Sequence, residues 1–411
     1  MKILIADKFE KVGIDGLKEL GCTVVSLPDL TTEALPVALK EHDPNVLIVR
    51  STKVTGDALR SGTSLSLVIR AGAGIDTIDV NAASDLGVFV SNCPGRNSIA
   101  VAELVMGLVL ACDRRIPDQV ADLRAGRWHK GEYSRARGLH GRTFGIVGLG
   151  QIGREIAMRA AGFGMHVAAW SRNLTLAEAE RLGLRYCQTP LEVARVSDVV
   201  SINVAANPDT RNLVSEEFLA AMRPGAYLIN TSRGSVIDEP ALVQAIRNKG
   251  VRVGLDVFQN EPTAPTGTFD SAIAKEPGVY GTHHVGASTE QAQVAIAHEV
   301  IHIVQEYQHS GIVPNCVNRL ARSSASHILA VRHRNRPGVL ADVFRVLADR
   351  AINVEEVENI IYHGAHATLA RIHLDGQPDP GSLSRIRDGN PDIISAELSA
   401  IDGRGPRNGK G

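Results

Sequence analysis

Short apolar runs alternate with amphipathic stretches through the N-terminal part of the chain. Apolar runs of roughly four to eight residues bounded by turn-forming residues are typical of strands buried in a parallel sheet. The pattern predicts a helix at residues 13–20 and strands at residues 2–6, 23–26, 46–50, 67–70 and 88–91. Strands and helices in alternation indicate a parallel α/β fold.

A second α/β series begins after Gly141, with strands predicted at residues 143–147, 166–170, 199–204, 226–230 and 253–257. A helix is predicted at residues 241–249, between the last two of these strands. Two longer helical stretches, residues 98–112 and 290–308, flank the series. The stretch 98–112 is too densely apolar for a helix that faces solvent, so we expect it to be buried in a core or a subunit interface.

The first strand of the second series ends in a glycine-rich turn, Gly148-x-Gly150-x-x-Gly153, and apolar residues resume at once as a helix. This spacing permits a tight turn, a close approach of the backbone to a pyrophosphate and close packing of helix on strand. The helix N-terminus offers N–H groups to the negative charge. We therefore expect a bound dinucleotide to contact Gly148, Gly150, Gln151, Ile152 and Gly153.

The order of the two series predicts that one domain is inserted in another. Residues 98–284 would form a doubly wound, Rossmann cofactor domain, and residues 1–97 and 285–318 a flavodoxin-like α/β substrate domain. Residues 319–326 are polar and small, as in a linker. Beyond them we expect an α+β domain over residues 327–402, with a helix at 339–349 and strands at 328–333, 353–361 and 366–373. The tail, 403–411, is rich in Gly, Arg and Lys and is expected to be disordered.

The composition limits the possible partners. A formal net charge of -1 over 411 residues gives no electrostatic reason to expect nucleic acid or an anionic membrane. The apolar stretch 104–112 is too short to span a membrane, and the N-terminal apolar run is too short for a signal peptide. The five cysteines are scattered, without a Cys-x-x-Cys pair. They indicate reduced thiols, no structural metal and a cytoplasmic protein.

Three charged side chains stand at the borders of elements in the second series. Arg233 and Glu261 each follow a predicted strand, and His284 precedes the helix at 290–308. Ligands of a doubly wound sheet bind beyond the carboxyl ends of its strands, so the three can converge near one nicotinamide. The chemistry that needs them is hydride transfer at a 2-hydroxy or 2-oxo acid.

In that reaction His284 would take or give the hydroxyl proton, and Glu261 would orient the imidazole and favour its charged form. Arg233 would hold the substrate carboxylate and polarise the carbonyl. Taken singly, each of the three residues fits a surface, loop or core role better than a catalytic one. Taken together, their order downstream of the glycine turn favours catalysis. Chemistry alone leaves the choice between His283 and His284 open.

Residues 1–317 resemble the D-isomer-specific 2-hydroxyacid dehydrogenases, and the segments that contain Arg233, Glu261 and His284 carry the resemblance. In that family a proline precedes the catalytic histidine, which opens a His-x-Gly-Ala-Ser-Thr motif. The resemblance therefore assigns catalysis to His284 and puts His283 at the proline position. It also implies a homodimer or homotetramer, and cofactor contacts from Val204, Thr231, Ser232, Arg233, Asp256, His284 and Gly286.

Within the family the chain is most similar to the phosphoglycerate dehydrogenases, through the segments 49–54, 70–76 and 97–104. This implies oxidation of 3-phospho-D-glycerate to 3-phosphooxypyruvate, the first step of phosphorylated L-serine synthesis. A phosphorylated substrate needs cations. The expected substrate contacts are Arg50, Ser51, Lys53, Arg70, Ala73, Gly74 and Asn97. Two alternatives stay open: another 2-hydroxyacid dehydrogenase, such as a glyoxylate/hydroxypyruvate reductase, and a non-catalytic amino-acid sensor or corepressor.

The cofactor pocket departs from the usual NAD pattern. The second strand of such a site usually ends in Asp or Glu, which binds the ribose hydroxyls, whereas this chain has Ser171 and then Arg172. The segment around Val204 also lacks the family's usual proline. The resemblance implies NAD, but Ser171 does not repel a 2′-phosphate and Arg172 could bind one, so NADP stays open.

The C-terminal part, residues 327–402, resembles the ACT amino-acid-binding domain. In serine-inhibited members of the family a His, an Asn two positions later and an Asn after the helix hold the effector. His333, Asn335 and Asn353 match these positions, so the resemblance implies L-serine or another amino acid as an effector. The alternative is that the two asparagines are turn residues and the domain only dimerises.

Overall fold

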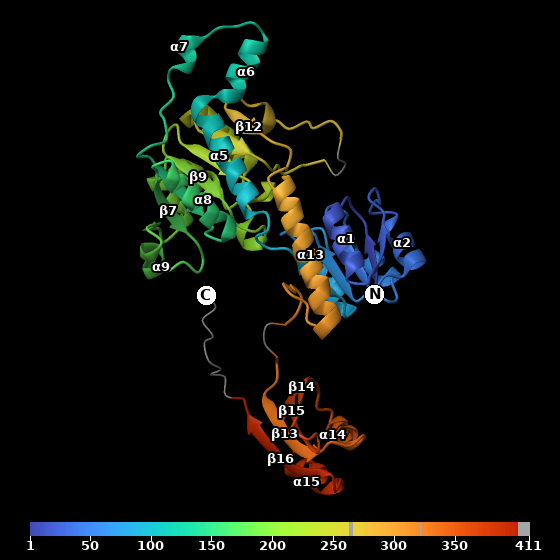
Figure 1. The fold of residues 1–411 in the computed structure, drawn as a ribbon. Helices are drawn as coiled ribbons and strands as arrows, with labels where there is room; N and C mark the ends of the chain where they lie inside the picture. The colour runs from blue at the N-terminus through green and yellow to red at the C-terminus, as the bar shows by residue number, and fades with distance from the viewer. Residues whose placement is uncertain (263–265, 321–322, 402–411) are drawn as a thin grey trace. The chain divides into compact units, whose positions relative to one another are not determined.

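The computed structural model describes residues 1–262, 266–320 and 323–401 (Figure 1). The chain forms two compact units, Met1–Asn318 and Arg319–Gly411. The predicted tail, residues 403–411, lies outside the described residues, as do residues 321 and 322 of the predicted linker.

Five parallel strands form the first sheet, in the order β2-β1-β3-β4-β5, which is the flavodoxin-like order. They are β1 (Lys2–Ile5), β2 (Thr23–Ser26), β3 (Val46–Val49), β4 (Leu67–Arg70) and β5 (Phe89–Asn92). Helices cover both faces, which is why the central strands are continuous apolar runs. One face packs on α1 (Lys11–Glu19) and α13 (Glu290–Ser310), and the other on α2 (Leu35–His42), α3 (Gly56–Ser61) and α4 (Val80–Asp85).

Seven parallel strands form the second sheet, in the order β12-β11-β10-β9-β6-β7-β8. They are β6 (Thr143–Val147), β7 (His166–Trp170), β8 (Arg185–Tyr186), β9 (Val199–Ile202), β10 (Tyr227–Asn230), β11 (Arg252–Leu255) and β12 (Val279–Gly281). After β6 the chain adds β7 and β8 on one side of that strand and then β9 to β12 on the other side, so the strand order reverses at β6. Ligands bind beyond the carboxyl ends of strands at such a reversal. The predicted doubly wound sheet is confirmed.

Helices cover both faces of this sheet. One face packs on α5 (Ser98–Arg114), α8 (Gln151–Gly162) and α9 (Leu176–Arg181), and the other on α10 (Pro190–Val196), α11 (Glu216–Ala221) and α12 (Glu239–Lys249). Ten residues of α5 are buried, as its dense apolar pattern predicts. The helix packs against α8 and the strands β10 and β11.

Two short helices that the apolar pattern did not predict, α6 (Ile116–Arg124) and α7 (Lys130–Tyr133), project from the seven-stranded sheet (Figure 1). Neither helix has a buried residue. Polar contacts order the segment instead, since the Asp122 carboxylate is hydrogen-bonded to Arg127, His129 and Tyr133. Such contacts leave no periodic apolar signal in a sequence.

The second unit is an antiparallel sheet in the order β14-β15-β13-β16. Its strands are β13 (His327–Arg334), β14 (Val354–Ile361), β15 (Ala367–Leu374) and β16 (Ile393–Ala400), and α14 (Val339–Ala348) and α15 (Pro380–Gly389) pack on one face. The predicted α+β class is confirmed. The apolar pattern did not predict α15 and β16, because α15 buries two residues and β16 buries one, too few for a clear period.

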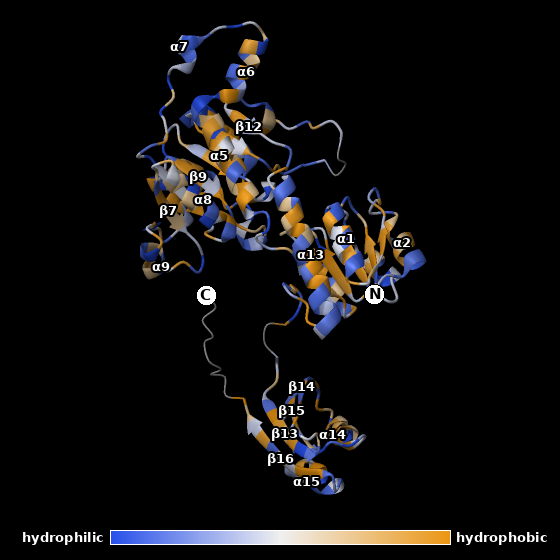
Figure 2. Ribbon diagram, viewed as in Figure 1, coloured by the Kyte–Doolittle hydropathy of each residue, from blue (hydrophilic) through white to orange (hydrophobic). Residues whose placement is uncertain are grey.

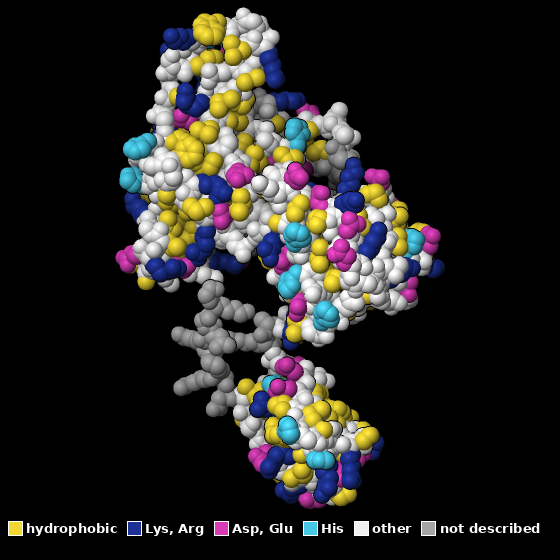
Figure 3. Space-filling view, in the orientation of Figure 1, with side chains coloured by type: hydrophobic (Ala, Val, Ile, Leu, Met, Phe, Trp, Pro, Cys, Tyr) yellow, Lys and Arg dark blue, Asp and Glu magenta, His cyan; other side chains and the backbone are white. Residues whose placement is uncertain are grey.

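Hydrophobic residues concentrate on the strands and on α5 (Figure 2). Lys, Arg, Asp and Glu side chains are interspersed over the visible surface, in agreement with the small net charge (Figure 3). Among the described helices, none combines the length and the apolar character that crossing a membrane requires.

Candidate active site and cofactor site

The turn between β6 and α8 has a backbone path that requires glycine. Gly148 has a φ of +99°, and a Cβ there would lie 2.5 Å from the carbonyl oxygen of Asn203. A Cβ on Gly153 would lie 2.4 Å from the carbonyl oxygen of Gly148. Space is open beside Gly150, and no side chain caps α8, which begins at Gln151. This open turn and uncapped helix N-terminus fit a pyrophosphate.

The end of β7 places Ser171 and Arg172 beside the same turn, because the Gly148 N–H donates to the last residue of β7. Arg172 is exposed, and its side chain makes no hydrogen bond or ion pair with any described residue. Val204, after β9, lies against the turn, and Ile152 packs on the core beneath α8. Neither Ser171 nor Arg172 carries negative charge, so this strand end does not repel a 2′-phosphate.

His284 and Glu261 form a hydrogen-bonded pair, with 2.7 Å between Nδ1 and Oε2. The other carboxylate oxygen of Glu261 accepts from the Phe258 N–H at 2.8 Å. Burial opposes ionisation of Glu261, but the hydrogen bonds from His284 and Phe258 outweigh it and hold the pKa of this carboxyl below its usual value. The imidazole is half-exposed and can reach a ligand.

Arg233 faces the carboxylate of Asp76, which lies in the segment 70–76 and was not predicted to be a site residue. Its Nη2 and Nε donate to the two oxygens of Asp76 at 2.9 and 3.2 Å, and its Nη1 donates to the Ser232 carbonyl oxygen at 2.7 Å. Ala73 and Gly74 precede Asp76 in the loop after β4, and a Cβ on Gly74 would lie 2.3 Å from Nη2. The loop that was predicted to bind substrate therefore contacts the predicted catalytic arginine.

Arg70, the last residue of β4, lies close to two other guanidinium groups. Its Nη1 would be 1.8 Å from a Cβ on Gly72, so the side chain lies directly over that glycine. Burial, and then the like charge of Arg233 and of Arg50, lowers the pKa of Arg70, while Asp76 opposes the shift. Its Nε is buried and has no hydrogen-bond partner among the described residues. Arg70 and Arg233 thus lie close to Asp76, and Arg50 adds a third positive charge close to Arg70.

The loop after β3 is shaped by Asp7, which the sequence did not single out. One Asp7 carboxylate oxygen accepts from the backbone N–H groups of Arg50, Ser51 and Thr52 at 2.6, 3.1 and 3.2 Å. These bonds fix the backbone from which the Arg50 side chain extends. Lys53 is exposed, and its ammonium makes no ion pair with a described residue.

Asp256 holds the segment that carries His284, the predicted catalytic histidine. Its buried carboxylate accepts from the Thr282 hydroxyl at 2.6 Å and from the N–H groups of Val285 and Gly286 at 2.9 Å each. Its carbonyl oxygen accepts from the His284 N–H at 2.8 Å, and His284 itself has a φ of +53°. Asp256 therefore positions His284. From the sequence Asp256 was expected to contact the cofactor, and this positioning role was not predicted.

Asn97, at the start of α5, carries a buried side-chain oxygen without a hydrogen-bond partner among the described residues, and so does Ser98. Buried polar groups in native proteins are nearly always paired, so these two atoms suit a polar ligand. Thr231 and Ser232 follow β10 and are partly exposed. The Ser232 hydroxyl donates to the side-chain oxygen Oδ1 of Asn230 at 2.7 Å.

In the second unit, His333 is 3% exposed, its Nδ1 is bonded to the Arg334 carbonyl at 2.8 Å, and its Nε2 has no partner among the described residues. Thr368 lies opposite His333 on β15 and has a buried hydroxyl that is likewise unpaired. The sequence did not single out Thr368. The amides of Asn335 and Asn353 bond elsewhere, to a carbonyl and to a glutamate.

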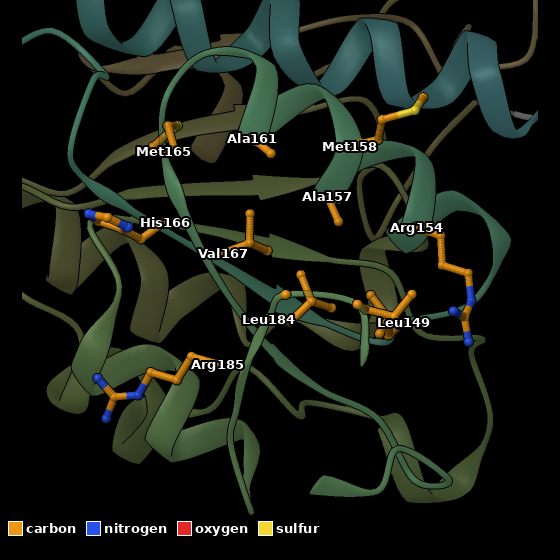
Figure 4. A pocket seen from close by; sticks show the side chains of 12 residues that line it. Leu149, Arg154, Ala157, Met158, Ala161, Met165, His166, Val167, Leu184 and Arg185 are labelled. Carbon is orange, nitrogen blue, oxygen red and sulfur yellow. The ribbon is translucent and has the colours of Figure 1, made fainter. Parts of the chain in front are cut away.

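A cavity of about 540 Å³ lies between α8, β7 and the segment before β8 (Figure 4). Leu149, Val167 and Leu184 are among its apolar lining residues, and no predicted site residue lines it. Within the described part of the chain, no group of three or more His, Cys, Asp or Glu residues could hold a metal ion.

Comparison with known proteins gives the class to which this site belongs. Residues 106–286 match the D-isomer specific 2-hydroxyacid dehydrogenase, NAD binding domain, and residues 327–358 match the ACT domain. The chain is 34% identical over 409 residues to the D-3-phosphoglycerate dehydrogenase of Methanocaldococcus jannaschii, covering 96% of this chain and 74% of that relative. The chain therefore belongs to the D-isomer specific 2-hydroxyacid dehydrogenases.

Other members of the family carry different names. The chain is 39% identical over 260 residues to a hydroxypyruvate reductase of Thermotoga maritima, covering 62% of this chain and 82% of that protein. A structure of NADPH-dependent glyoxylate/hydroxypyruvate reductase from Sinorhizobium meliloti superposes with a TM-score of 0.66 at 29% identity, over 78% of this chain and 99% of that one. The chain spans 58% to 66% of the length of several other relatives named D-3-phosphoglycerate dehydrogenase.

Proposed function

We propose that the protein oxidises 3-phospho-D-glycerate to 3-phosphooxypyruvate, the first step of phosphorylated L-serine synthesis. The observation that carries this proposal is that Arg50 and Arg233 both act on Arg70, while Asp76 is the one carboxylate among the charges that act on it, so positive charge is in excess. Such an excess suits a substrate that bears both a carboxylate and a phosphate. The Methanocaldococcus jannaschii relative bears the corresponding name.

His284 would accept the hydroxyl proton of the substrate. Because its Nδ1 is tied to the Glu261 carboxylate, the neutral ring carries its proton on Nδ1 and accepts through Nε2. Glu261, held ionised, stabilises the imidazolium that forms. Arg233 binds the carboxylate and, in the reverse direction, polarises the carbonyl. A bound nicotinamide dinucleotide supplies the hydride acceptor.

Residues 98–284 would bind that dinucleotide, and residues 1–97 with 285–318 the substrate. The family resemblance supports NAD. NADP is the alternative, because Arg172 is exposed beside Ser171 at the end of β7 and because the Sinorhizobium meliloti relative is NADPH-dependent. A charge-assisted bond from Arg172 to a 2′-phosphate would give that preference.

Turnover followed by nicotinamide absorbance tests the proposal, with 3-phosphoglycerate, phosphooxypyruvate, hydroxypyruvate and glyoxylate as substrates. His284→Ala should lower kcat by about 100-fold to 10,000-fold while dinucleotide binding persists, because general acid–base catalysis contributes that much. His283→Ala is the matched control and should stay near wild type, since that exposed ring bonds to no described residue. Full turnover by His284→Ala would contradict the mechanism.

A glyoxylate/hydroxypyruvate reductase is the second candidate, favoured by Ser171-Arg172 and by the Thermotoga maritima relative. A higher kcat/KM with hydroxypyruvate or glyoxylate than with either phosphorylated substrate would support it. An absence of turnover with every substrate would instead support a non-catalytic sensor.

For the second unit we propose that L-serine or another amino acid binds at His333, Asn335 and Asn353 and bridges two ACT domains of a homodimer or homotetramer. The buried, unpaired Nε2 of His333 supports this, because leaving such a group unsatisfied costs about 1 to 3 kcal/mol. Binding would shift the oligomer toward a less active state.

A further inference from the structure

Asp76 is an acidic residue in a site that must attract an anion. It belongs to the loop after β4, on the five-stranded sheet, whereas Arg233 follows β10 of the seven-stranded sheet. The two side chains form a bidentate pair, with Nη2 to Oδ1 at 2.9 Å and Nε to Oδ2 at 3.2 Å. The pair therefore joins the two sheets at the place where the proposed reaction occurs.

The pair leaves part of the Arg233 guanidinium available. This group has five N–H donors. Two of them go to Asp76 and one goes from Nη1 to the Ser232 carbonyl oxygen. One N–H on Nη1 and one on Nη2 have no acceptor among the described residues. Two donors on these neighbouring nitrogens match the two oxygens of a substrate carboxylate.

We propose that Asp76 is a positioning residue, which fixes the plane of the Arg233 guanidinium so that its two remaining donors face the substrate carboxylate. The inference rests on the proposed hydride transfer. An unheld arginine samples many rotamers, and each misplaced rotamer loses the geometry that the reaction requires. Asp76 thus acts through Arg233 and need not touch the substrate.

The backbone beneath the pair supports this role. A Cβ on Gly74 would lie 2.3 Å from Nη2 of Arg233 and 2.7 Å from Oδ1 of Asp76, so the pair lies directly against the chain at Gly74. Burial opposes ionisation of Asp76, but the hydrogen bonds and charge of Arg233, and then the charge of Arg70, lower the pKa of this carboxyl. Asp76 therefore keeps its negative charge at neutral pH.

Steady-state kinetics of Asp76→Asn test the proposal, with the 2-hydroxy acid that the wild-type protein uses best. We expect kcat/KM for this acid to fall about 10-fold to 100-fold, as for a misplaced catalytic group, while the KM for the dinucleotide stays unchanged. The melting temperature should fall only slightly, because a partly exposed ion pair contributes at most about 1 kcal/mol. Asp76→Glu, which keeps the charge, should recover part of the loss. Asp79→Asn removes the same charge from the same loop and should behave like wild type, since asparagine caps α4 as well as aspartate does.

A double-variant cycle with Arg233→Lys shows whether Asp76 acts through the arginine. Lysine has no planar fork to orient, so adding Asp76→Asn to Arg233→Lys should cost little more. The inference is overturned if Asp76→Asn has wild-type kinetics, or if its cost is the same with and without Arg233. If the wild-type protein turns over none of the 2-hydroxy acids, the proposed function fails and this inference fails with it.

Discussion

Ser171 and Arg172 are the side chains that meet the 2′ position of the adenosine ribose if the glycine turn holds a dinucleotide. An NAD site usually has a carboxylate at the end of the second strand, which both binds the ribose and repels a 2′-phosphate. Here β7 ends in Trp170, and the next two residues are a hydroxyl and an exposed guanidinium. At the scale of the residue, therefore, we propose that Arg172 decides the choice of cofactor.

Arg172→Ala tests that choice. If the protein uses NADP, the variant should lose about tenfold or more in kcat/KM for that cofactor, because a hydrogen bond to a charged group contributes about 1.5 to 3 kcal/mol. Its kcat/KM for NAD should not change. Arg181→Ala removes an exposed arginine from the end of α9 and serves as the control. A strong preference for NAD that Arg172→Ala leaves intact would exclude the NADP proposal.

The helix α8 shows that glycines in one element can have opposite roles. Gly153 lies where a Cβ would strike a backbone carbonyl oxygen at 2.4 Å, whereas nothing lies within 4 Å of a Cβ on Gly162, at the other end of the helix. A clash with backbone cannot be relieved by a side-chain rotation. The close approach of α8 to the turn therefore depends on Gly153 and not on Gly162.

Two alanine substitutions separate these roles. Gly153→Ala should destabilise the protein by about 1 to 3 kcal/mol, as overpacking does, and should weaken dinucleotide binding. Gly162→Ala should be neutral or stabilising by up to about 1 kcal/mol, because alanine favours the helix. Urea denaturation and a dinucleotide titration measure both effects. Equal stability of the two variants would show that the turn can relax around Gly153.

At the scale of the whole molecule, the chain divides after Asn318. Asn318 itself belongs to the first unit, since its side chain accepts from the Val90 N–H at 2.8 Å and donates to the Val88 carbonyl oxygen at 2.9 Å. All residues proposed for hydride transfer precede this point, and all residues proposed for the effector follow it. Catalysis and its regulation should therefore be separable.

A chain that ends at Asn318 should keep its turnover and lose any response to millimolar serine. In the full chain, serine should lower activity and raise the melting temperature, because a ligand that binds the folded state stabilises it. His333→Ala in the full chain should remove both effects and leave basal turnover intact. Inhibition of the shortened chain by serine would place the effector site outside the ACT domain, and a full chain that serine does not affect would exclude serine as the effector.

Local patterns explain what could be predicted from the sequence. The predicted strands agree with the observed ones to within two residues, because a buried parallel strand must be a continuous apolar run and its ends are marked by polar residues or glycine. From the sequence Glu261 was expected to orient the imidazole of His284, and the two side chains are hydrogen-bonded in the structure. The contacts of these residues with substrate and cofactor stay predictions.

The tertiary structure decided what depends on residues that are distant in the chain. Asp76 meets Arg233 across a separation of 157 positions, and Asp7 orders the backbone of Arg50 across 43. Neither contact has a period or a spacing that a sequence could show. The elements α15 and β16 were missed for a related reason, since they bury too few residues to mark a face.

The sequence by itself determined the α/β class of the two sheets and the glycine turn, because these depend on hydrophobic period and on the backbone freedom of glycine; the catalytic roles of Arg233, Glu261 and His284 stay predictions. The turn could be predicted as a dinucleotide cradle from its glycine spacing and its place between a strand and a helix. Only the tertiary structure showed how the end of β4 and the loop after it supply the Arg70 guanidinium and the Asp76 carboxylate to the neighbourhood of Arg233. Which charges face one another is set by how the two sheets pack, and packing is a property of the folded chain.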